Sequence, residues 1–114
     1  MILVSQNKKT IISFNEIQML QVCGKTVVGA TTGTKNLYVI RLYPTLNDYF
    51  ETKNGKSKHI EMAEYTSEEQ AISAIEQVIS YMCTNSIFSF PPDKSIKLTE
   101  SITAINKYSD TSYL

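Results

Sequence analysis

The chain has 114 residues, in which 11 lysines and arginines balance 11 aspartates and glutamates, so its formal net charge at neutral pH is zero. A chain of this length can bury one hydrophobic core but cannot form a large two-lobed cleft. The balanced charge removes the overall electrostatic attraction that nonspecific binders of nucleic acid or anionic membranes usually show.

The first part of the chain has the pattern of short β-strands separated by turn residues. Residues 2–4 and 10–14 are rich in β-branched and aromatic side chains, and the polar stretch between them predicts an opening hairpin. Two further strands are predicted at 17–23 and 26–31, with a turn at Gly24 joining them. This succession favours an antiparallel meander.

The next strand is predicted at 36–43, where both faces are apolar apart from Arg41. Such a strand belongs in the middle of a sheet. If Ile40 faces the helix predicted below at 66–82, the opposite face of the sheet carries the apolar side chains Leu37, Val39 and Tyr43. We expect that face to be covered by the C-terminal tail, by a second copy in a homodimer, or by a partner.

A polar excursion follows at 45–58 and contains Asn54-Gly55, a strong turn signal. Both a protruding β-hairpin and an irregular loop fit this stretch. It brings together rings and positive charges, the mixture that single-stranded nucleic acid prefers, in Tyr49, Phe50, Lys53, Lys56 and Lys58. A solubilising loop tip is the simpler explanation for the same residues.

A last strand is predicted at 59–65, and the clearest helix signal follows at 66–82. Thr66 and Glu69 have the spacing of a capping box, in which each side chain bonds to the other residue's backbone N–H group. Apolar residues recur on one helical face, which we expect to be buried on the strands: Ala71, Ile72, Ile75, Val78, Ile79 and Met82.

Carboxylates gather before and along this helix, with no lysine or arginine between them, at Glu61, Glu64, Glu68, Glu69 and Glu76. A solvated strand edge and helix face, favoured by the helix dipole, is the simpler explanation. As a functional alternative, the patch could imitate a phosphate backbone and occupy a basic nucleic-acid channel.

The remaining signals complete an α+β fold. Residues 87–90 form an apolar run stopped by two prolines, which suits an edge strand. The predicted architecture is an antiparallel meander of roughly five or six strands with the 66–82 helix packed on one face. We expect one domain over 1–92 and an extension over 93–114, where helical spacing predicts a short helix through Leu98, Ile102, Ile105 and Tyr108.

No constellation in the sequence points to catalysis or to a bound metal. His59 is the only histidine, and no catalytic motif ties a serine or cysteine to it. Cys23 and Cys83 lie far apart and form no metal-ligand motif with it. We therefore expect a solvated histidine, free thiols and neither enzymatic activity nor a cofactor. Without an export signal or an apolar run near the roughly 18 residues that cross a bilayer, we expect a cytoplasmic protein of a bacterial host.

Three stretches carry a family resemblance, namely ILVSQNKKTIISF at 2–14, AEYTSEEQAISAIEQVI at 63–79 and FSFPPD at 88–93. Together they resemble a group of small proteins of phages and mobile elements of Gram-positive bacteria, which share a Ser-Gln-Asp-Lys hairpin and a Tyr-x-x-Glu-Glu-x-Ala helix. This chain departs at Asn7, where the group has aspartate, and at Pro91, where it has methionine. The group is mostly of unassigned function, so no catalytic residue is carried over.

The resemblance implies a context in which small accessory proteins bind and block a host protein, and inhibitors of CRISPR nucleases are one class of that size. The leading hypothesis is thus a nonenzymatic protein-binding module, including an anti-CRISPR-type inhibitor of an RNA-guided nuclease. The alternative is a nucleic-acid-binding accessory protein that uses the loop Lys53 to Lys58, and an enzyme ranks last. The expected partner-binding residues are Tyr49, Phe50, Lys53, Lys56, Lys58, Glu61, Glu64, Glu68 and Glu76.

Overall fold

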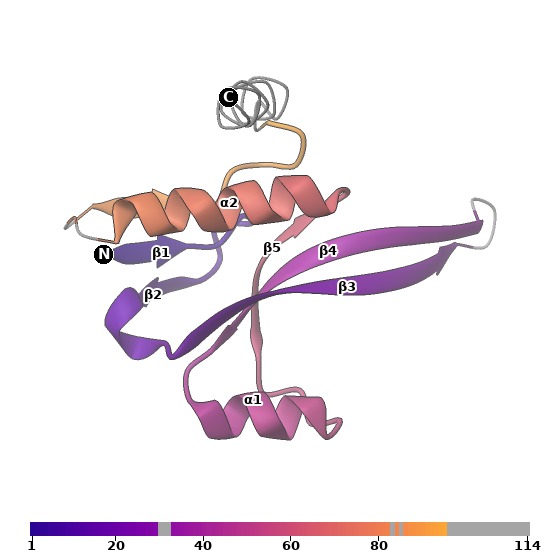
Figure 1. The fold of residues 1–114 in the computed structure, drawn as a ribbon, viewed down its shortest axis with the longest axis horizontal. Coiled ribbons are helices and arrows are strands. Elements are labelled where there is room, and N and C mark those ends of the chain that lie inside the picture. Colours follow the sequence, from indigo (N-terminus) through magenta and orange to yellow (C-terminus); the bar gives the residue numbers. More distant parts are fainter. Residues whose placement is uncertain (30–32, 83, 85, 96–114) are drawn as a thin grey trace, which may run out of the picture.

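The computed structural model describes residues 1–29, 33–82, 84 and 86–95 and shows an α+β fold (Figure 1). One sheet, which we call sheet A, has the strand order β2-β1-β6 and consists of β1 (Ile2–Val4), β2 (Ile11–Ser13) and β6 (Ile87–Ser89). β1 pairs antiparallel with β2 but parallel with β6. The strands therefore do not form the single antiparallel meander expected from the sequence. A short 3-10 helix, η1 (Phe14–Glu16), leads out of sheet A.

Sheet B contains the long strands β3 (Met19–Gly29) and β4 (Gly33–Tyr43) and the shorter β5 (Ile60–Tyr65), all antiparallel in the order β3-β4-β5. The turn predicted at Gly24 is wrong, because Gly24 pairs with Tyr38 inside one continuous ladder. The β-forming residues on both sides carry the strand through the glycine. Since β5 pairs only with the inner part of β4, the outer part of the β3–β4 hairpin projects as a two-stranded ribbon (Figure 1).

A β-bulge interrupts the pairing of β4 with β5. Ile40 lies opposite Ala63 while Arg41 lies opposite Glu61, so Met62 is the extra residue. Met62 and Ala63 are consequently both buried. The same bulge brings Glu61 and Glu64, which are three positions apart, to one face of the sheet, where both approach Lys25.

The predicted helix is present as α2 (Glu68–Tyr81), but its start and its buried face differ from the expectation. The capping box at Thr66 is wrong: Ser67 is the N-cap, and its hydroxyl oxygen accepts from the N–H of Gln70 at 3.2 Å. The buried face is made by Ala71, Ala74 and Val78, because small side chains let the helix approach sheet B closely. The larger members of the predicted stripe flank this contact, and Ile72, Ile79 and Met82 are 42%, 59% and 48% exposed.

The excursion at 45–58 contains a helix, α1 (Leu46–Lys53), and neither a hairpin nor an irregular loop. Thr45 caps its start, since the Thr45 hydroxyl oxygen accepts from the N–H of Asp48 at 3.1 Å. The Asn54-Gly55 signal ends this helix, with Gly55 at a φ of 97°. The short helix predicted through Leu98 to Tyr108 lies outside the described residues.

The main core fills the space between α2 and the two sheets. Its buried members are Leu3, Ile40, Leu42, Met62, Ala63, Tyr65, Ala71, Ala74, Val78, Phe88 and Phe90. On the other face of sheet B, Leu37, Val39 and Tyr43 are also buried, at 7%, 1% and 2% exposed. Because these three side chains are already covered, their apolar character no longer argues for a dimer or a partner on that face.

Candidate functional site

A polar pocket lies between the face of sheet B that turns away from α2 and the helix α1. Its volume is about 260 Å³, and we call it the Arg41 pocket. β3 contributes Gln21, β4 contributes Arg41 and Tyr43, and α1 contributes the rest of the lining, which is Tyr49, Thr52 and Lys53. The rings of Tyr43 and Tyr49 meet edge to face with centroids 5.3 Å apart, which holds α1 against the end of β4.

The side chain of Arg41 forms no hydrogen bond or ion pair with any other described residue, and its Nε is buried. Glu61 lies opposite Arg41 in the sheet, but its carboxylate reaches Lys25 instead, at 3.9 Å. Two hydrogen bonds hold the side-chain amide of Gln21. Its Oε1 accepts from the Tyr43 hydroxyl at 3.0 Å and from the Cys23 thiol at 3.2 Å. The amide Nε2 of Gln21 is therefore the end with free donors.

His59 borders this region and is not the solvated histidine expected from the sequence. Its ring centroid lies 6.4 Å from that of Tyr43, and its Nδ1 is buried without a hydrogen-bond partner among the described residues. Burial and the positive charge of Arg41 lower the pKa of His59 below 6.5, and Glu61 opposes this in part. The imidazole is thus held toward its neutral form first by burial and then by the charge of Arg41.

The basic and aromatic residues named as candidates divide between α1 and the segment that follows it. Lys53 lines the Arg41 pocket, whereas Lys56 and Lys58 are exposed beyond the end of the helix. Phe50 is 51% exposed and is free to contact a partner. Tyr49 packs against Tyr43 and so offers less of its face for stacking.

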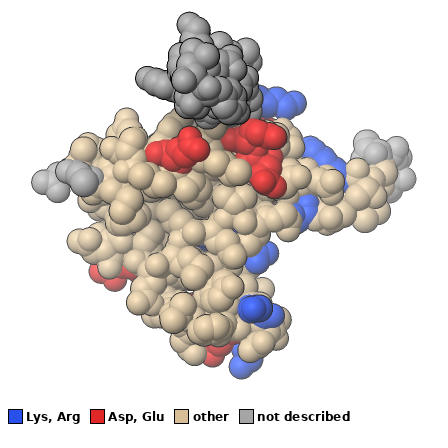
Figure 2. Space-filling model, in the orientation of Figure 1, with Lys and Arg blue, Asp and Glu red and all other residues tan. Residues whose placement is uncertain are grey.

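The acidic candidates do not form one continuous patch. Glu61 and Glu64 lie on sheet B and share Lys25, with Nζ to carboxylate distances of 3.9 and 3.8 Å. Glu68 and Glu76 lie on α2, which covers the other face of that sheet. Figure 2 shows acidic side chains gathered over α2, while basic side chains extend from the β3–β4 hairpin to α1. The carboxylates are therefore more widely separated in the structure than their positions in the sequence suggest, and Lys25 offsets part of their charge.

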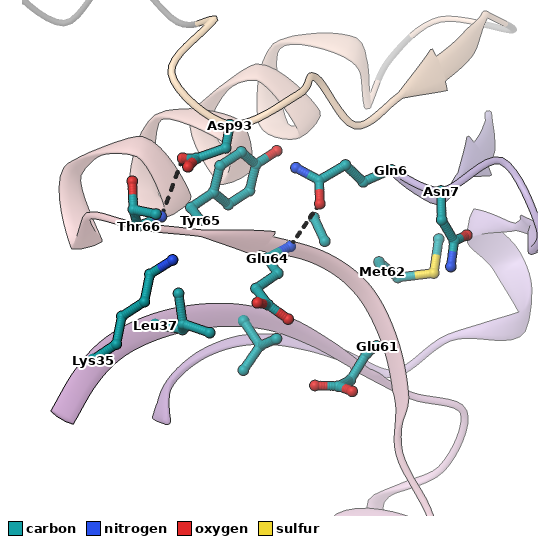
Figure 3. A pocket seen from close by; sticks show the side chains of 12 residues that line it. Gln6, Asn7, Lys35, Leu37, Glu61, Met62, Glu64, Tyr65, Thr66 and Asp93 are labelled. Carbon is teal, nitrogen blue, oxygen red and sulfur yellow. Dashed lines mark hydrogen bonds between the residues drawn. The ribbon is translucent and has the colours of Figure 1, made fainter. Parts of the chain in front are cut away.

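A second hollow, the cleft in Figure 3, has a volume of about 450 Å³ and lies between the β1–β2 loop, β5 and the segment around Asp93. The backbone N–H of Thr66 donates to the Asp93 carboxylate at 3.1 Å, and that of Glu64 donates to Gln6 Oε1 at 3.0 Å. Lys35 stands at its edge. The polar groups along this cleft are largely used to hold three segments together.

A third hollow is apolar, has a volume of about 350 Å³ and lies between α2 and the start of β3. We call it the α2 groove. Its lining includes Phe14, Ile17 and Met19 from one side and Ile75, Ile79 and Met82 from the helix and its end. Two members of the predicted apolar stripe that the core does not bury, Ile79 and Met82, lie along it.

Within the described residues, no group of three or more His, Cys, Asp or Glu side chains is placed to hold a metal ion. Cys23 is a free thiol there, and Cys83 lies outside that part of the chain. None of the helices in the described part is long and apolar enough to cross a membrane.

Sequence reasoning did not identify Arg41, Gln21 and Lys25 as candidate site residues. The available signal was Arg41 itself, the one charged residue in a strand that is apolar on both faces. Comparison of the chain with protein-family models, with curated proteins and with solved structures finds no match.

Proposed function

We propose that this chain is a nonenzymatic protein-binding module of phage or mobile-element origin, which acts by binding a protein in the cytoplasm of a bacterial host. The origin rests on the resemblance of the three stretches that include Gln6, Glu64 and Pro91. The binding role rests on one observation, the α2 groove with its exposed apolar border. An RNA-guided CRISPR nuclease is the specific target to be tested.

The α2 groove has the properties of a contact surface. Scattered exposed apolar residues are ordinary, but a continuous exposed patch beside a groove is typical of interaction sites. Ile79 and Met82, which line the groove, are 59% and 48% exposed, and Glu76 is exposed one turn before Ile79. Glu16 is exposed on η1, which leads into β3. We therefore expect a partner that inserts apolar side chains flanked by lysine or arginine, as a basic nucleic-acid-binding surface would offer.

The test measures DNA cleavage by purified RNA-guided nucleases with and without excess of this protein. Inhibition is expected, and the double variant Ile79→Gln, Met82→Gln should remove it without changing the circular dichroism spectrum. The matched control is Val28→Gln, since Val28 is 78% exposed at the far end of the β3–β4 hairpin. Full cleavage with every effector would exclude this target class.

The acidic side chains provide an alternative contact surface for the same function. Charge reversal at Glu64, Glu68 and Glu76 should abolish inhibition if these carboxylates imitate a phosphate backbone. If the groove is the contact, reversal of Glu64 and Glu68 alone leaves most of the inhibition in place, because Glu76 is the one of the three that borders the groove. The two sets of variants therefore decide between the groove and the carboxylates.

A second candidate function is binding of single-stranded nucleic acid by the segment from Lys53 to Lys58. It is favoured by the position of Lys53, which adds its charge to that of Arg41, and by the exposure of Phe50. Binding of short oligonucleotides should then weaken steeply with salt and with Lys56→Gln. Absence of salt-dependent binding would reject this function.

A further inference from the structure

The Arg41 pocket has a chemistry that the protein-binding proposal does not use. We propose that it binds a small tetrahedral oxyanion, phosphate or a phosphate monoester, between the guanidinium of Arg41 and the ammonium of Lys53. The pocket and α2 lie on opposite sides of sheet B, so this inference does not depend on the α2 groove.

The first argument is the unused capacity of Arg41. A guanidinium has five N–H donors, and a buried donor without an acceptor is costly. Arg41 has no hydrogen-bond acceptor among the described residues, since Glu61 is drawn to Lys25 at 3.9 Å. An oxyanion at this position would accept from the planar guanidinium in the bidentate geometry that arginine offers to phosphate.

The second argument concerns the charge and the hydrogen-bonding groups of the side chains that line the pocket. Two of the six lining side chains are cations and none is a carboxylate. Gln21 presents its amide N–H groups, because Tyr43 and Cys23 both donate to its Oε1. The Thr52 hydroxyl oxygen accepts from the N–H of Lys58 at 3.0 Å, which leaves its own hydrogen to donate. The Tyr43 hydroxyl uses its hydrogen on Gln21, so the donors that remain for an oxyanion come from Arg41, Lys53, Gln21 and Thr52.

The third argument concerns the end of α1, whose free carbonyls would repel an anion. The chain turns back over them, so Asn54 N–H donates to the carbonyl of Phe50 at 3.1 Å and Gly55 N–H to that of Thr52 at 3.0 Å. Lys56 N–H donates to the carbonyl of Glu51 at 2.9 Å. These bonds occupy three of the last four carbonyl groups, those of Phe50, Glu51 and Thr52, and reduce the opposing charge beside Lys53.

The size of the pocket limits the ligand. Its volume of about 260 Å³ lies below the roughly 300–1,000 Å³ of pockets that enclose drug-sized molecules. A tetrahedral anion fits, and the exposed side of Lys53 leaves room for the ester group of a monoester to extend into solvent.

The test uses the full chain and sulfate as a probe, at constant ionic strength maintained with chloride. We expect saturable chemical-shift changes at the Arg41 Nε–H and the Gln21 side-chain amide in nuclear magnetic resonance spectra. Lys53→Gln should weaken binding about tenfold, the effect of losing one charge-assisted hydrogen bond. Arg41→Gln should abolish it.

The matched control is Lys56→Gln, which removes an equal charge on the same segment but outside the pocket lining. Changes that do not saturate, or equal weakening by Lys53→Gln and Lys56→Gln, would overturn the proposal in favour of diffuse ion binding. Should Arg41→Gln not fold, the comparison of the two lysine variants still decides, because both side chains are exposed.

The source of the anion is distinguished by comparing inorganic phosphate with a mononucleotide and with an oligonucleotide carrying or lacking a 5′-phosphate. Preference for the phosphorylated oligonucleotide assigns the pocket to a nucleic-acid end, and equal binding of phosphate alone assigns it to the free anion.

As an independent readout, bound sulfate should raise the pKa of His59, because it offsets the charge of Arg41 that lowers this pKa. An unchanged His59 pKa at saturating sulfate would count against the position of the site.

Discussion

Tyr65 donates its phenolic hydrogen to the carbonyl oxygen of Pro91 at 2.8 Å, and Gln6 Nε2 donates to the same oxygen at 3.1 Å. Gln6 also accepts from the backbone N–H of Glu64 at 3.0 Å. The loop after β1, the end of β5 and the segment after β6 are therefore joined at one point, although they are far apart in sequence. These three segments belong to the three stretches that carry the sequence resemblance, and in the structure they form one unit.

The first prediction concerns this joint. Tyr65→Phe should lower the free energy of unfolding by about 1 kcal/mol, the usual net value of one hydrogen bond, because Pro91 keeps the bond from Gln6. Gln6→Ala together with Tyr65→Phe should cost more than the sum of the single changes, since the Pro91 carbonyl then loses both donors. Urea unfolding followed by circular dichroism measures this, with Tyr81→Phe as an exposed control. Strict additivity would contradict a shared acceptor.

The second prediction separates the two candidate caps of α2. Ser67→Ala should cost about 1 kcal/mol of unfolding free energy, because the N–H of Gln70 loses its acceptor. Thr66→Ala should change it by less than about 0.5 kcal/mol, since the structural contact of Thr66 runs through its backbone N–H to Asp93. Equal losses in thermal and urea unfolding would restore the capping box at Thr66.

The elements that could be predicted from the sequence are those that neighbouring residues decide. β1, β2, β5, β6 and α2 were predictable because composition and periodicity along a few neighbouring residues decide them. The helix α1 was missed because the turn signal at Asn54-Gly55 was given more weight than the cap formed by Thr45 and Asp48. An Asn-Gly pair can end a helix as well as form the turn of a β-hairpin, so it does not by itself distinguish the two.

The division into two sheets could not be predicted in this way. It depends on the parallel pairing of β1 with β6, which brings together residues 2–4 and 87–89. The Arg41 pocket has a similar origin, because it requires the bulge at Ile40 and Arg41 and the diversion of Glu61 to Lys25. Such relationships arise from register and packing, and neither leaves a periodic pattern in the chain.

The third prediction tests which face of α2 holds the core together. Val78→Ala should cost about 2 kcal/mol, because Val78 is 1% exposed and its loss removes buried methyl groups and leaves a cavity. Ile79→Ala removes a larger side chain but should change the unfolding free energy by less than about 0.5 kcal/mol, since Ile79 is 59% exposed. Urea unfolding of both variants provides the comparison. A greater loss for Ile79→Ala would show that the helix is rotated relative to this description.

The last prediction concerns pH. Because burial and Arg41 lower the pKa of His59 in the folded protein, the unfolded chain binds more protons than the folded one just below pH 6.5. The contribution of His59 to stability is therefore complete above that pH and is lost as the pH falls toward its folded pKa. Urea midpoints measured between about pH 7.5 and about pH 5, a range in which few carboxylates titrate, should fall with acidification. His59→Gln should flatten this dependence, and Arg41→Gln should reduce it, because each removes part of the cause. If His59→Gln leaves the slope of the wild-type protein intact, another group must titrate and the assignment to His59 fails.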